Sequence, residues 1–550
     1  MGPGREGQNW GMTDNQMRRP QGEELARSGL DLPRLAGLVT TAEPRRPRQV
    51  RSPLDGSLVG TVPVGTSEDV AQAARTARAA QAGWAARPVV ERCQIASRFR
   101  DLVLGEQDGL LALIHAETGK SRINAFEELM DTALTAGYYS TNAGRHLRAR
   151  RRHGAIPGLT GAVESYQPKG VVGIIAPWNY PLTLAVSDAV SALLAGNAVV
   201  LKPDSATPFT ALAALELLRR AGLPKEVMQL VTGPGAVLGP PLIDAVDYLM
   251  FTGSSATGAE VAAQCARRLI GCSAELGGKN PMLVLADADI DRAVEGGVQA
   301  CYSTTGQLCV SIERVYVHQS RYEEFCQRFA ARTAQLRLGT GAGWEVDLGP
   351  LISQDQFDKV SAHVADAVAK GATVLAGGRA RPDLGPWFFE PTVLTGVTEE
   401  MRLAREETFG PVVGVYPVAD DAQAIAAAND TEYGLNASVW SADAAHAMAV
   451  ARRLRAGTVN INEGYASAWA SHDAPMGGMG HSGVGRRHGA EGIRKYTEPQ
   501  TIASQRLLLL GPPPGVPRSA YASAMTLGGR VLHRLPLGEP ARWFRPLFSH

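Results

Sequence analysis

A thiol, a carboxylate and an amide stand in distinctive sequence contexts in this chain. Cys309 ends the segment T-T-G-Q-L-C, Glu275 begins E-L-G-G-K, and Asn179 is the centre of P-W-N-Y-P. A thiolate can attack an electrophilic carbon, an amide N–H can hold the oxyanion that forms, and a carboxylate can later activate water. The three together predict covalent acyl chemistry, with Cys309 as the nucleophile, Asn179 in the oxyanion site and Glu275 as the base.

Each of these residues has an ordinary alternative when it is taken alone. A single cysteine is most often a small buried hydrophobe, Glu275 could be a loop carboxylate paired with Lys279, and Asn179 could be a turn residue between two prolines. The cysteines without such neighbours are expected to be ordinary buried residues: Cys93, Cys265, Cys272, Cys301 and Cys326. The combination, rather than any one residue, favours catalysis.

Six ordered segments resemble the aldehyde dehydrogenase superfamily, over about residues 52 to 505. They are P-W-N-Y-P at 177–181, F-T-G-S at 251–254, E-L-G-G-K at 275–279, the Cys309 segment, E-E-T-F-G-P at 406–411, and P-M-G-G with S-G-V-G-R between 475 and 486. In that family the Glu and the Cys are 34 positions apart, as Glu275 and Cys309 are here. The resemblance implies an NAD(P)-dependent oxidation of an aldehyde to a carboxylic acid through a thioester on Cys309.

Strand and helix patterns that could position these residues alternate along the chain. Short β-prone apolar runs lie at 171–176, 198–201, 228–231 and 248–251. Helical patterns lie at 70–114, at 210–221 and, after a second α/β series starts near Met282, at 357–370. Buried strands that alternate with helices predict parallel α/β sheets.

The resemblance implies the fold in more detail: two Rossmann-type three-layer α/β domains with parallel sheets, plus a small β oligomerisation flap. The predicted boundaries are a disordered N-terminal extension at 1–48, a cofactor-binding domain at 49–145 and 169–277, oligomerisation strands at 146–168 and 494–506, a catalytic domain at 278–493 and a C-terminal tail at 507–550. A homo-oligomer, dimer or tetramer, is expected.

Two turns that follow strands are the predicted cofactor contacts. The segment G-S-S-A-T-G at 253–258 opens a helix, and amides at a helix N-terminus suit a pyrophosphate. The segment Lys202-Pro203-Asp204-Ser205 resembles the family's site for the adenosine ribose. NAD-preferring members usually have Glu at the position of Ser205, and Ser beside Lys accommodates a 2′-phosphate. We therefore expect NADP, with NAD as the alternative, unless Asp204 points inward.

By resemblance the other cofactor contacts are Trp178, Asn179, Gly253, Ser254, Leu276, Glu407 and Phe409. Without that resemblance, the turn at 253–258 could be an ordinary strand-to-helix connection and Glu407 a surface carboxylate.

The run from 475 to 500 resembles one branch, the NADP-dependent succinate-semialdehyde dehydrogenases, and predicts oxidation of succinate semialdehyde to succinate. Well-studied enzymes with that activity grip the substrate carboxylate with two arginines, whose positions are Ser187 and Ser303 here. The alternative is a broad-specificity or aromatic aldehyde dehydrogenase, with Tyr180, Tyr465 and Trp469 around an apolar pocket. Retention of Glu275 argues against a CoA-acylating enzyme, and Cys309 with Glu275 argues against a non-catalytic relative.

Composition limits the partners. The 550 residues include 55 Lys+Arg and 54 Asp+Glu, so no overall field attracts nucleic acid or an anionic membrane. A small-molecule aldehyde is the expected partner. Six cysteines without a CxxC pair predict neither a disulfide framework nor a metal site, and with no apolar signal segment they favour the reducing cytoplasm.

Overall fold

The computed structural model describes residues 25, 29–154, 160–505 and 511–532. Within them the chain forms two compact units. The larger runs up to Leu147 and from Gln167 to Glu498, and the smaller comprises Arg148–Tyr166 and the chain from Pro499 onward. In the described part of the chain no helix has the length and apolar character that a membrane crossing requires.

The larger unit contains a six-stranded sheet of order β17-β9-β8-β5-β6-β7, in which β17 is antiparallel to β9 and the others are parallel. Its strands are β5 (Val171–Ile175), β6 (Ala198–Lys202), β7 (Met228–Leu230), β8 (Tyr248–Thr252), β9 (Gly271–Glu275) and β17 (Gly483–Val484). The four predicted strands β5 to β8 are confirmed. All residues of β5, β6 and β8 are buried, because helices cover both faces of a parallel sheet.

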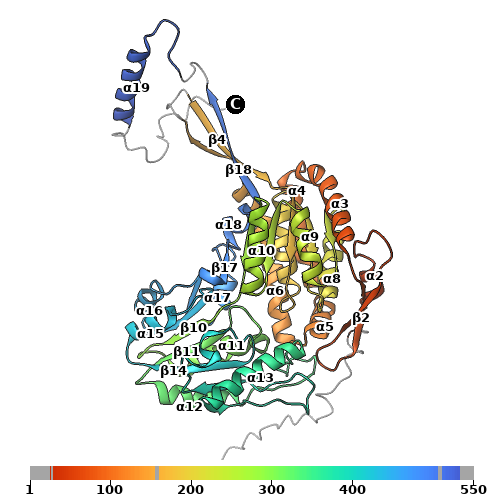
Figure 1. Cartoon of the computed structure of the whole chain (residues 1–550), viewed down its shortest axis with the longest axis vertical. Helices are drawn as coiled ribbons and strands as arrows, with labels where there is room; N and C mark the ends of the chain where they lie inside the picture. Colours follow the sequence, from red (N-terminus) through yellow and green to blue (C-terminus); the bar gives the residue numbers. More distant parts are fainter. Residues whose placement is uncertain (1–24, 26–28, 155–159, 506–510, 533–550) are drawn as a thin grey trace, which may run out of the picture. The chain divides into compact units, whose positions relative to one another are not determined.

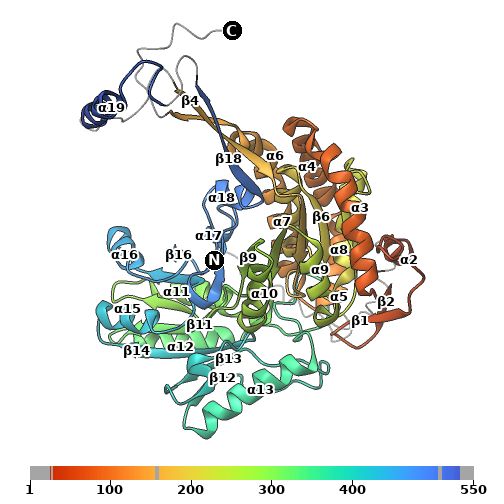
Figure 2. The same ribbon diagram turned by 45° about the horizontal axis from the view of Figure 1, so that its top comes forward.

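The helices around this sheet are α3 (Ser67–Ala85), α4 (Val89–Gly105), α5 (Gln107–Thr118), α6 (Arg122–Leu147), α7 (Thr183–Leu194), α8 (Pro208–Arg220), α9 (Gly235–Ala245) and α10 (Ser255–Arg267). Figure 2 shows α3, α9 and α10 together on one side of the sheet. Helix α7 packs on the other side with α8 beside it, and α4 and α6 pack against α7. The helices expected at 70–114 and 210–221 are confirmed as α3 to α5 and α8.

A seven-stranded sheet of order β12-β13-β14-β11-β10-β15-β16 forms the other part of the larger unit. Its strands are β10 (Asn280–Val284), β11 (Ile312–His318), β12 (Thr373–Ala376), β13 (Thr392–Thr395), β14 (Val412–Val418), β15 (Asn436–Trp440) and β16 (Thr458–Ile461). Strand β12 is antiparallel to β13, and the other neighbours are parallel. This is the second α/β series expected from Met282 onward.

Alternation along the strands determines how the helices cover this second sheet. Met282 and Val284 belong to the core under α11 (Ile290–Tyr302) and α12 (Tyr322–Thr333), whereas Leu283 lies in the core under α15 (Asp421–Asn429) and α16 (Ala444–Ala451). These helices are labelled in Figure 1. The remaining helices of the larger unit's second half are α13 (Gln354–Ala369), α14 (Arg402–Arg405), α17 (Ala466–Trp469), α18 (Gly489–Arg494), η1 (Ser303–Gly306) and η2 (Gly480–Ser482). Helix α13 confirms the helix expected at 357–370.

Within the segment predicted as a disordered extension at 1–48, residues 29–48 contain regular structure, while 1–24 and 26–28 lie outside the described residues. A short helix, α2 (Leu32–Ala36), begins where the Asp31 carboxylate accepts a hydrogen bond from Arg34 N at 3.0 Å. Leu35 and Val39 are buried in the first core. The segment then enters β1 (Pro47–Arg51), which pairs with β2 (Leu58–Pro63). It is ordered because it buries apolar side chains that the sequence analysis did not weigh.

The smaller unit has a three-stranded sheet of order β18-β4-β3, made of β3 (Arg150–His153), β4 (Thr160–Pro168) and β18 (Thr497–Gln505). Strands thus form in the segments predicted for oligomerisation. The predicted C-terminal tail contains a helix, α19 (Arg518–Leu532), that the sequence patterns did not predict. Residues 507–510 and 533–550 of the tail lie outside the described ranges. The predicted domain limits stay predictions.

Candidate active site

The predicted site residues follow strands that end at one edge of the first sheet. From β5 the chain proceeds through β6 and β7 on one side and returns to form β8 and β9 on the other, so the strand order reverses at β5. Parallel sheets bind ligands in the crevice at such a reversal. Asn179 follows β5, Gly253 follows β8 and Leu276 follows β9.

One cleft of about 210 Å³ brings most of these residues together. Of the predicted residues it is lined by Trp178, Asn179, Gly253, Ser254, Glu275, Leu276, Cys309, Glu407 and Phe409. Lys202, Pro203, Asp204 and Ser205 are not in this lining and lie at the carboxyl end of β6.

A short connection between the two sheets brings the carboxylate to the thiol. Glu275 ends β9 in the first sheet, and Asn280 begins β10 in the second only a few residues later. The Asn280 Nδ2 donates to the Cys309 carbonyl at 2.8 Å, and Cys309 itself precedes β11, the neighbour of β10. The E-L-G-G-K segment therefore joins the sheets and positions Glu275 beside the cysteine turn.

The turn before Cys309 has an unusual backbone. Thr304, Thr305 and Gly306 have φ angles of 54°, 57° and 68°, all left-handed. A side chain at Gly306 would meet the Gly410 carbonyl, which lies 2.1 Å from the position of a Cβ. Left-handed non-glycine residues cost roughly 1–3 kcal/mol each and gather at functional sites. The Tyr180 hydroxyl, 2.9 Å from Thr304 Oγ1, helps to hold the turn.

Asn179 is buried and held from two sides. The side-chain Nδ2 of Asn179 donates to the Gln307 backbone carbonyl at 2.9 Å. The backbone carbonyl of Asn179 accepts from Lys120 Nζ at 2.6 Å. Lys120 in turn forms a buried ion pair with Glu128 at 2.8 Å. An amide nitrogen carries two hydrogens, so the second one remains available to an oxyanion in the cleft.

Glu275 is buried, and its Oε1 has no hydrogen-bond partner among the described residues. The alternative in which it pairs with Lys279 is wrong, because Lys279 pairs with Glu313 at 2.5 Å. Burial raises the pKa of Glu275 to about 7, against the opposing charge of Arg487. A carboxyl group with a pKa near neutral can take and release a proton, as a general base must.

Burial also raises the pKa of the Cys309 thiol to about 12, and the charges of Glu275 and Glu407 raise it further while Arg487 lowers it. The resting thiol is therefore protonated at neutral pH. A positive charge brought into the cleft, or transfer of the proton to a base, is needed to form the thiolate.

Arg487 is a buried cation that the sequence analysis missed. Its Nη2 lies 2.7 Å from Asp188 Oδ2, and Lys495 Nζ lies 3.0 Å from the other oxygen of that carboxylate. Arg487 Nη2 also donates to Thr252 Oγ1 at 2.8 Å. The R-R-H motif was visible in the sequence, but nothing there distinguished Arg487, which pairs with Asp188, from its neighbour Arg486, which donates to backbone carbonyls.

The nicotinamide end of a dinucleotide fits the residues of the cleft. Trp178 and Phe409 meet edge to face with ring centroids 5.6 Å apart. The Glu407 carboxylate accepts from Gly278 N at 2.9 Å, so Glu407 is not the surface carboxylate of the alternative interpretation. Carboxylates of this kind accept hydrogen bonds from ribose hydroxyls.

The adenosine end fits as well. Lys202 is 3% exposed and lies at the end of β6. Burial lowers the pKa of Lys202. The negative charge of Asp204 opposes this effect, and the positive charge of Arg48 adds to it. One oxygen of Asp204 accepts from its own turn at Ala206 N, at 2.8 Å. A cation buried at the end of this strand fits an anionic ligand.

The two positions of the missing arginine clamp lie in different surroundings. Ser187 lines a small cavity of about 20 Å³ together with Leu184, Trp469 and Arg487, whereas Ser303 is buried at the end of α11. Arg487 Nε, which has no hydrogen-bond partner among the described residues, is a donor near Ser187.

Two histidines that flank the glycine-rich segment at 477–480, His472 and His481, lie in different surroundings. Burial lowers the pKa of His472 to about 4, so it is neutral at physiological pH. His481 is exposed and lies 3.2 Å from Glu432.

Comparison with known proteins agrees with this geometry. A model of the Aldehyde dehydrogenase family matches residues 39–502. The chain belongs to the aldehyde dehydrogenase family. The expected fold and NAD(P)-dependent aldehyde dehydrogenase activity are thereby confirmed, and the match begins before the region from residue 52 that the motifs indicated.

Similar proteins are known in sequence and in structure. A Mycolicibacterium smegmatis protein named "Putative succinate-semialdehyde dehydrogenase (NADP+)" is 54% identical over 513 residues, which cover 93% of this chain and 99% of that protein. An E. coli structure titled as an NADP-dependent enzyme has a TM-score of 0.82 at 35% identity and covers 85% of this chain and 98% of its own. Betaine aldehyde dehydrogenase from Staphylococcus aureus, in complex with NAD+, has a TM-score of 0.82 at 31% identity over 88% of this chain and 99% of its own.

Proposed function

We propose that Cys309, Glu275 and Asn179 carry out the aldehyde oxidation. The observation that carries this assignment is their convergence in one cleft, with the Glu275 carboxylate unpartnered and Asn179 held by Lys120. The Cys309 thiolate adds to the aldehyde carbon, and the Asn179 side-chain amide with the Cys309 backbone N–H holds the resulting oxyanion. A nicotinamide cofactor held in this cleft would supply the hydride acceptor, and loss of a hydride from the adduct would leave a thioester on Cys309. Glu275 then takes a proton from water, which attacks the thioester and releases the acid.

The cofactor we propose is NADP. Lys202 and the nearby charge of Arg48 favour an added phosphate, Ser205 brings no negative charge, and Asp204 is engaged by its own turn. The M. smegmatis relative is named for NADP+, whereas the S. aureus neighbour was solved with NAD+. The proposed contacts are those predicted from the sequence: Trp178, Asn179, Lys202, Pro203, Asp204, Ser205, Gly253, Ser254, Leu276, Glu407 and Phe409.

The substrate we propose is succinate semialdehyde. The name of the M. smegmatis relative supports it. Arg487 offers an unbonded Nε beside Ser187, so a buried guanidinium is near one of the two clamp positions. A guanidinium that meets a carboxylate forms a strong charge-assisted hydrogen bond.

Aromatic or broad-range aldehydes are the second candidate. Tyr180 and Trp469 pack with ring centroids 5.8 Å apart, and Trp469 lines the small cavity beside Ser187. An aromatic wall of this kind would suit an apolar substrate.

A panel of aldehydes with each cofactor tests these proposals. Succinate semialdehyde should have a kcat/KM at least tenfold above that of butanal, which has the same chain length without the charge, and above that of benzaldehyde. Equal kcat/KM values for the three aldehydes would contradict succinate semialdehyde as the substrate, but not aldehyde oxidation as the reaction.

The kcat/KM with NADP should exceed that with NAD. Ser205→Glu should reverse that preference, because a carboxylate would face the 2′-phosphate. Ser205→Ala is the matched control.

We further propose that the enzyme is a homo-oligomer in the cytoplasm. All six cysteines are free thiols, which a reducing compartment maintains. A three-stranded sheet with exposed edges, such as β18-β4-β3, gains protection from a partner chain.

A further inference from the structure

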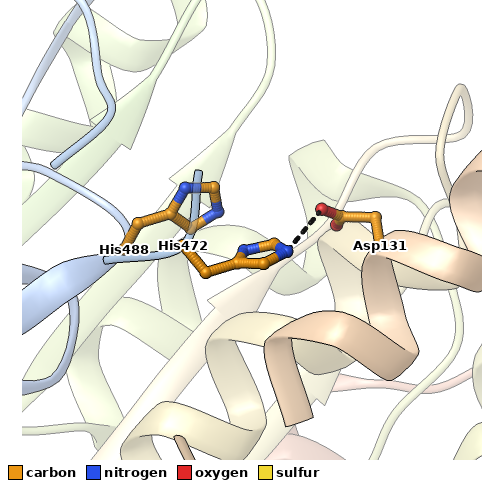
Figure 3. Close-up of side chains that lie close together, drawn as sticks. All are labelled: Asp131, His472 and His488. Carbon is orange, nitrogen blue, oxygen red and sulfur yellow. Dashed lines mark ion pairs between the residues drawn. The ribbon is translucent and has the colours of Figure 1, made fainter. Parts of the chain in front are cut away.

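Three buried side chains converge in the larger unit. Asp131 lies on α6, His472 follows α17, and His488 immediately precedes α18. They are 6%, 7% and 8% exposed, and one ligand atom of each lies within 4.8 Å of those of the other two. Figure 3 shows the two imidazole rings and the carboxylate close together.

Each of the three side chains has a polar atom without a hydrogen-bond partner among the described residues. These atoms are Asp131 Oδ1, His472 Nε2 and His488 Nδ1. Buried polar atoms are rarely left without a partner, because burial removes the water that would satisfy them. Two of these atoms, Asp131 Oδ1 and His472 Nε2, lie 3.7 Å apart, and the His488 ring adjoins them, which indicates a ligand between the three side chains.

The other atoms of two of these side chains are anchored. The second oxygen of Asp131 accepts from the Thr183 hydroxyl, and His472 Nδ1 lies 3.4 Å from the Thr135 hydroxyl. Histidines that bind metals commonly hydrogen-bond through their second ring nitrogen in this way, which orients the ring. The anchors leave Oδ1 of Asp131 and Nε2 of His472 directed toward each other.

The distance between those two atoms fits a shared ion better than a hydrogen bond. His472 Nε2 and Asp131 Oδ1 are 3.7 Å apart, beyond the usual hydrogen-bond range. Zinc bonds to histidine nitrogen and carboxylate oxygen are about 2.0–2.2 Å long, so two ligands of one tetrahedral ion are roughly 3.3–3.5 Å apart. A small inward movement would complete the geometry.

We propose that Asp131, His472 and His488 bind a divalent transition-metal ion of the Zn²⁺ type, with water as a further ligand. Two neutral imidazoles and one carboxylate are a donor set that zinc prefers. The cavity of about 20 Å³ that Asp131 and His488 line has room for such a water. The cysteine spacing gave no indication of this site, because its ligands are histidines and an aspartate from distant segments.

The ion would link the loop between His472 and His488 to helix α6. The ends of that loop are already joined to each other: Met476 and Arg487 exchange backbone hydrogen bonds of 2.9 and 2.6 Å, and Gly489 N donates to the His472 carbonyl at 2.7 Å. The loop also includes Gly477, which packs beside Glu275. We expect the metal to stabilise the loop rather than to take part in the chemistry.

The test uses the full chain carrying Cys309→Ser, so that the active-site thiol cannot bind the metal. After dialysis against a chelator, Zn²⁺ is titrated by calorimetry, and thermal unfolding is recorded with and without the ion. We expect about one ion per chain, a micromolar or lower Kd, and a Tm that rises with Zn²⁺ concentration. Co²⁺ in place of Zn²⁺ should give visible absorption bands without a thiolate charge-transfer band.

Ligand variants decide where the ion binds. Asp131→Asn, His472→Gln and His488→Asn should each weaken Zn²⁺ binding at least tenfold; Asn suits position 488 because His488 has a φ of 61°. His481→Ala, which removes an exposed histidine outside the cluster, should bind as the parent does. Zn²⁺ affinity that is equal in all four variants, or no binding to the parent, would overturn the proposal and leave a water in the cavity.

Discussion

At the scale of single residues, environment separates groups that are alike in the sequence. Lys279 and Glu313 neutralise each other at 2.5 Å, whereas Glu275 keeps an unpartnered oxygen and a pKa near 7. Arg487, whose side chain is 12% exposed, pairs with Asp188, whereas its neighbour Arg486 donates to the Gly478 and Gly485 carbonyls. Reactivity in this cleft depends on which charges are left unsatisfied after folding.

Glu275→Gln should separate the two halves of the reaction. The amide cannot accept a proton from water, so the thioester on Cys309 should form at close to the normal rate and hydrolyse at least a hundredfold more slowly. Rapid-quench mass spectrometry would then detect the acyl-enzyme, and Cys309→Ala should show none. Normal steady-state turnover in Glu275→Gln would contradict the role of base.

The pH dependence of thioester hydrolysis should follow Glu275. Because the base must be ionised and burial raises its pKa to about 7, the single-turnover rate should rise with pH through roughly neutral. Arg487 is the foremost charge that lowers this pKa, so Arg487→Gln should move the profile to higher pH.

Two variants serve as controls for that shift. Arg487→Lys keeps the charge and should restore most of the profile, and Arg486→Gln should move it less, since Arg486 has a smaller effect on Glu275. A profile that is identical in Arg487→Gln and the wild type would show that the guanidinium does not act on the base.

At the scale of elements, one buried ion pair holds the turn that carries Asn179. Lys120 precedes α6 and Glu128 lies on it; besides pairing with each other, Lys120 donates to the Asn179 carbonyl and Glu128 accepts from Leu182 N. The pair therefore joins α6 to the start of α7. The pair stabilises the protein mainly by joining these two helices, because the free-energy cost of desolvating two charges offsets much of the attraction between them.

Glu128→Ala should destabilise the protein by about 3–5 kcal/mol, because it leaves the Lys120 charge buried and unpaired. Glu68→Ala is the matched control: the Arg75–Glu68 pair is 2.7 Å long but exposed, and such pairs contribute about 0–1 kcal/mol. Thermal unfolding would compare the variants, with a fall in Tm of several degrees for Glu128→Ala alone. Equal Tm values would contradict a structural role for the pair.

At the scale of the whole molecule, the smaller unit contains the strand whose side chains are least packed in a single chain. Its residues in β18 are exposed along most of the strand, and Ile502 is 54% exposed. A sheet of three strands needs an apolar face that is covered, or packing against a helix, to be stable on its own. Assembly with another copy would provide that packing.

Ile502→Lys should shift the oligomer toward smaller species, because a charge would replace an apolar side chain in the proposed interface. Val237→Lys is the control, since Val237 on α9 is similarly exposed at 55%. Light scattering after size-exclusion chromatography at several protein concentrations measures the mass. A wild-type chain that stays monomeric, or an unchanged mass in Ile502→Lys, would argue against assembly through β18.

The sequence by itself determined the chemistry and the class of fold. Cys309, Glu275 and Asn179 lie in segments whose residue types leave few alternatives, and the runs that became β5 to β8 are mostly apolar and entirely buried because both faces are covered. Only the tertiary structure decided which charges surround those residues. The partner of Lys279, the burial of Arg487 and the meeting of Asp131 with His472 and His488 join segments far apart in the chain. Such contacts follow from how the helices and loops pack around the sheets, and local residue patterns do not encode that packing.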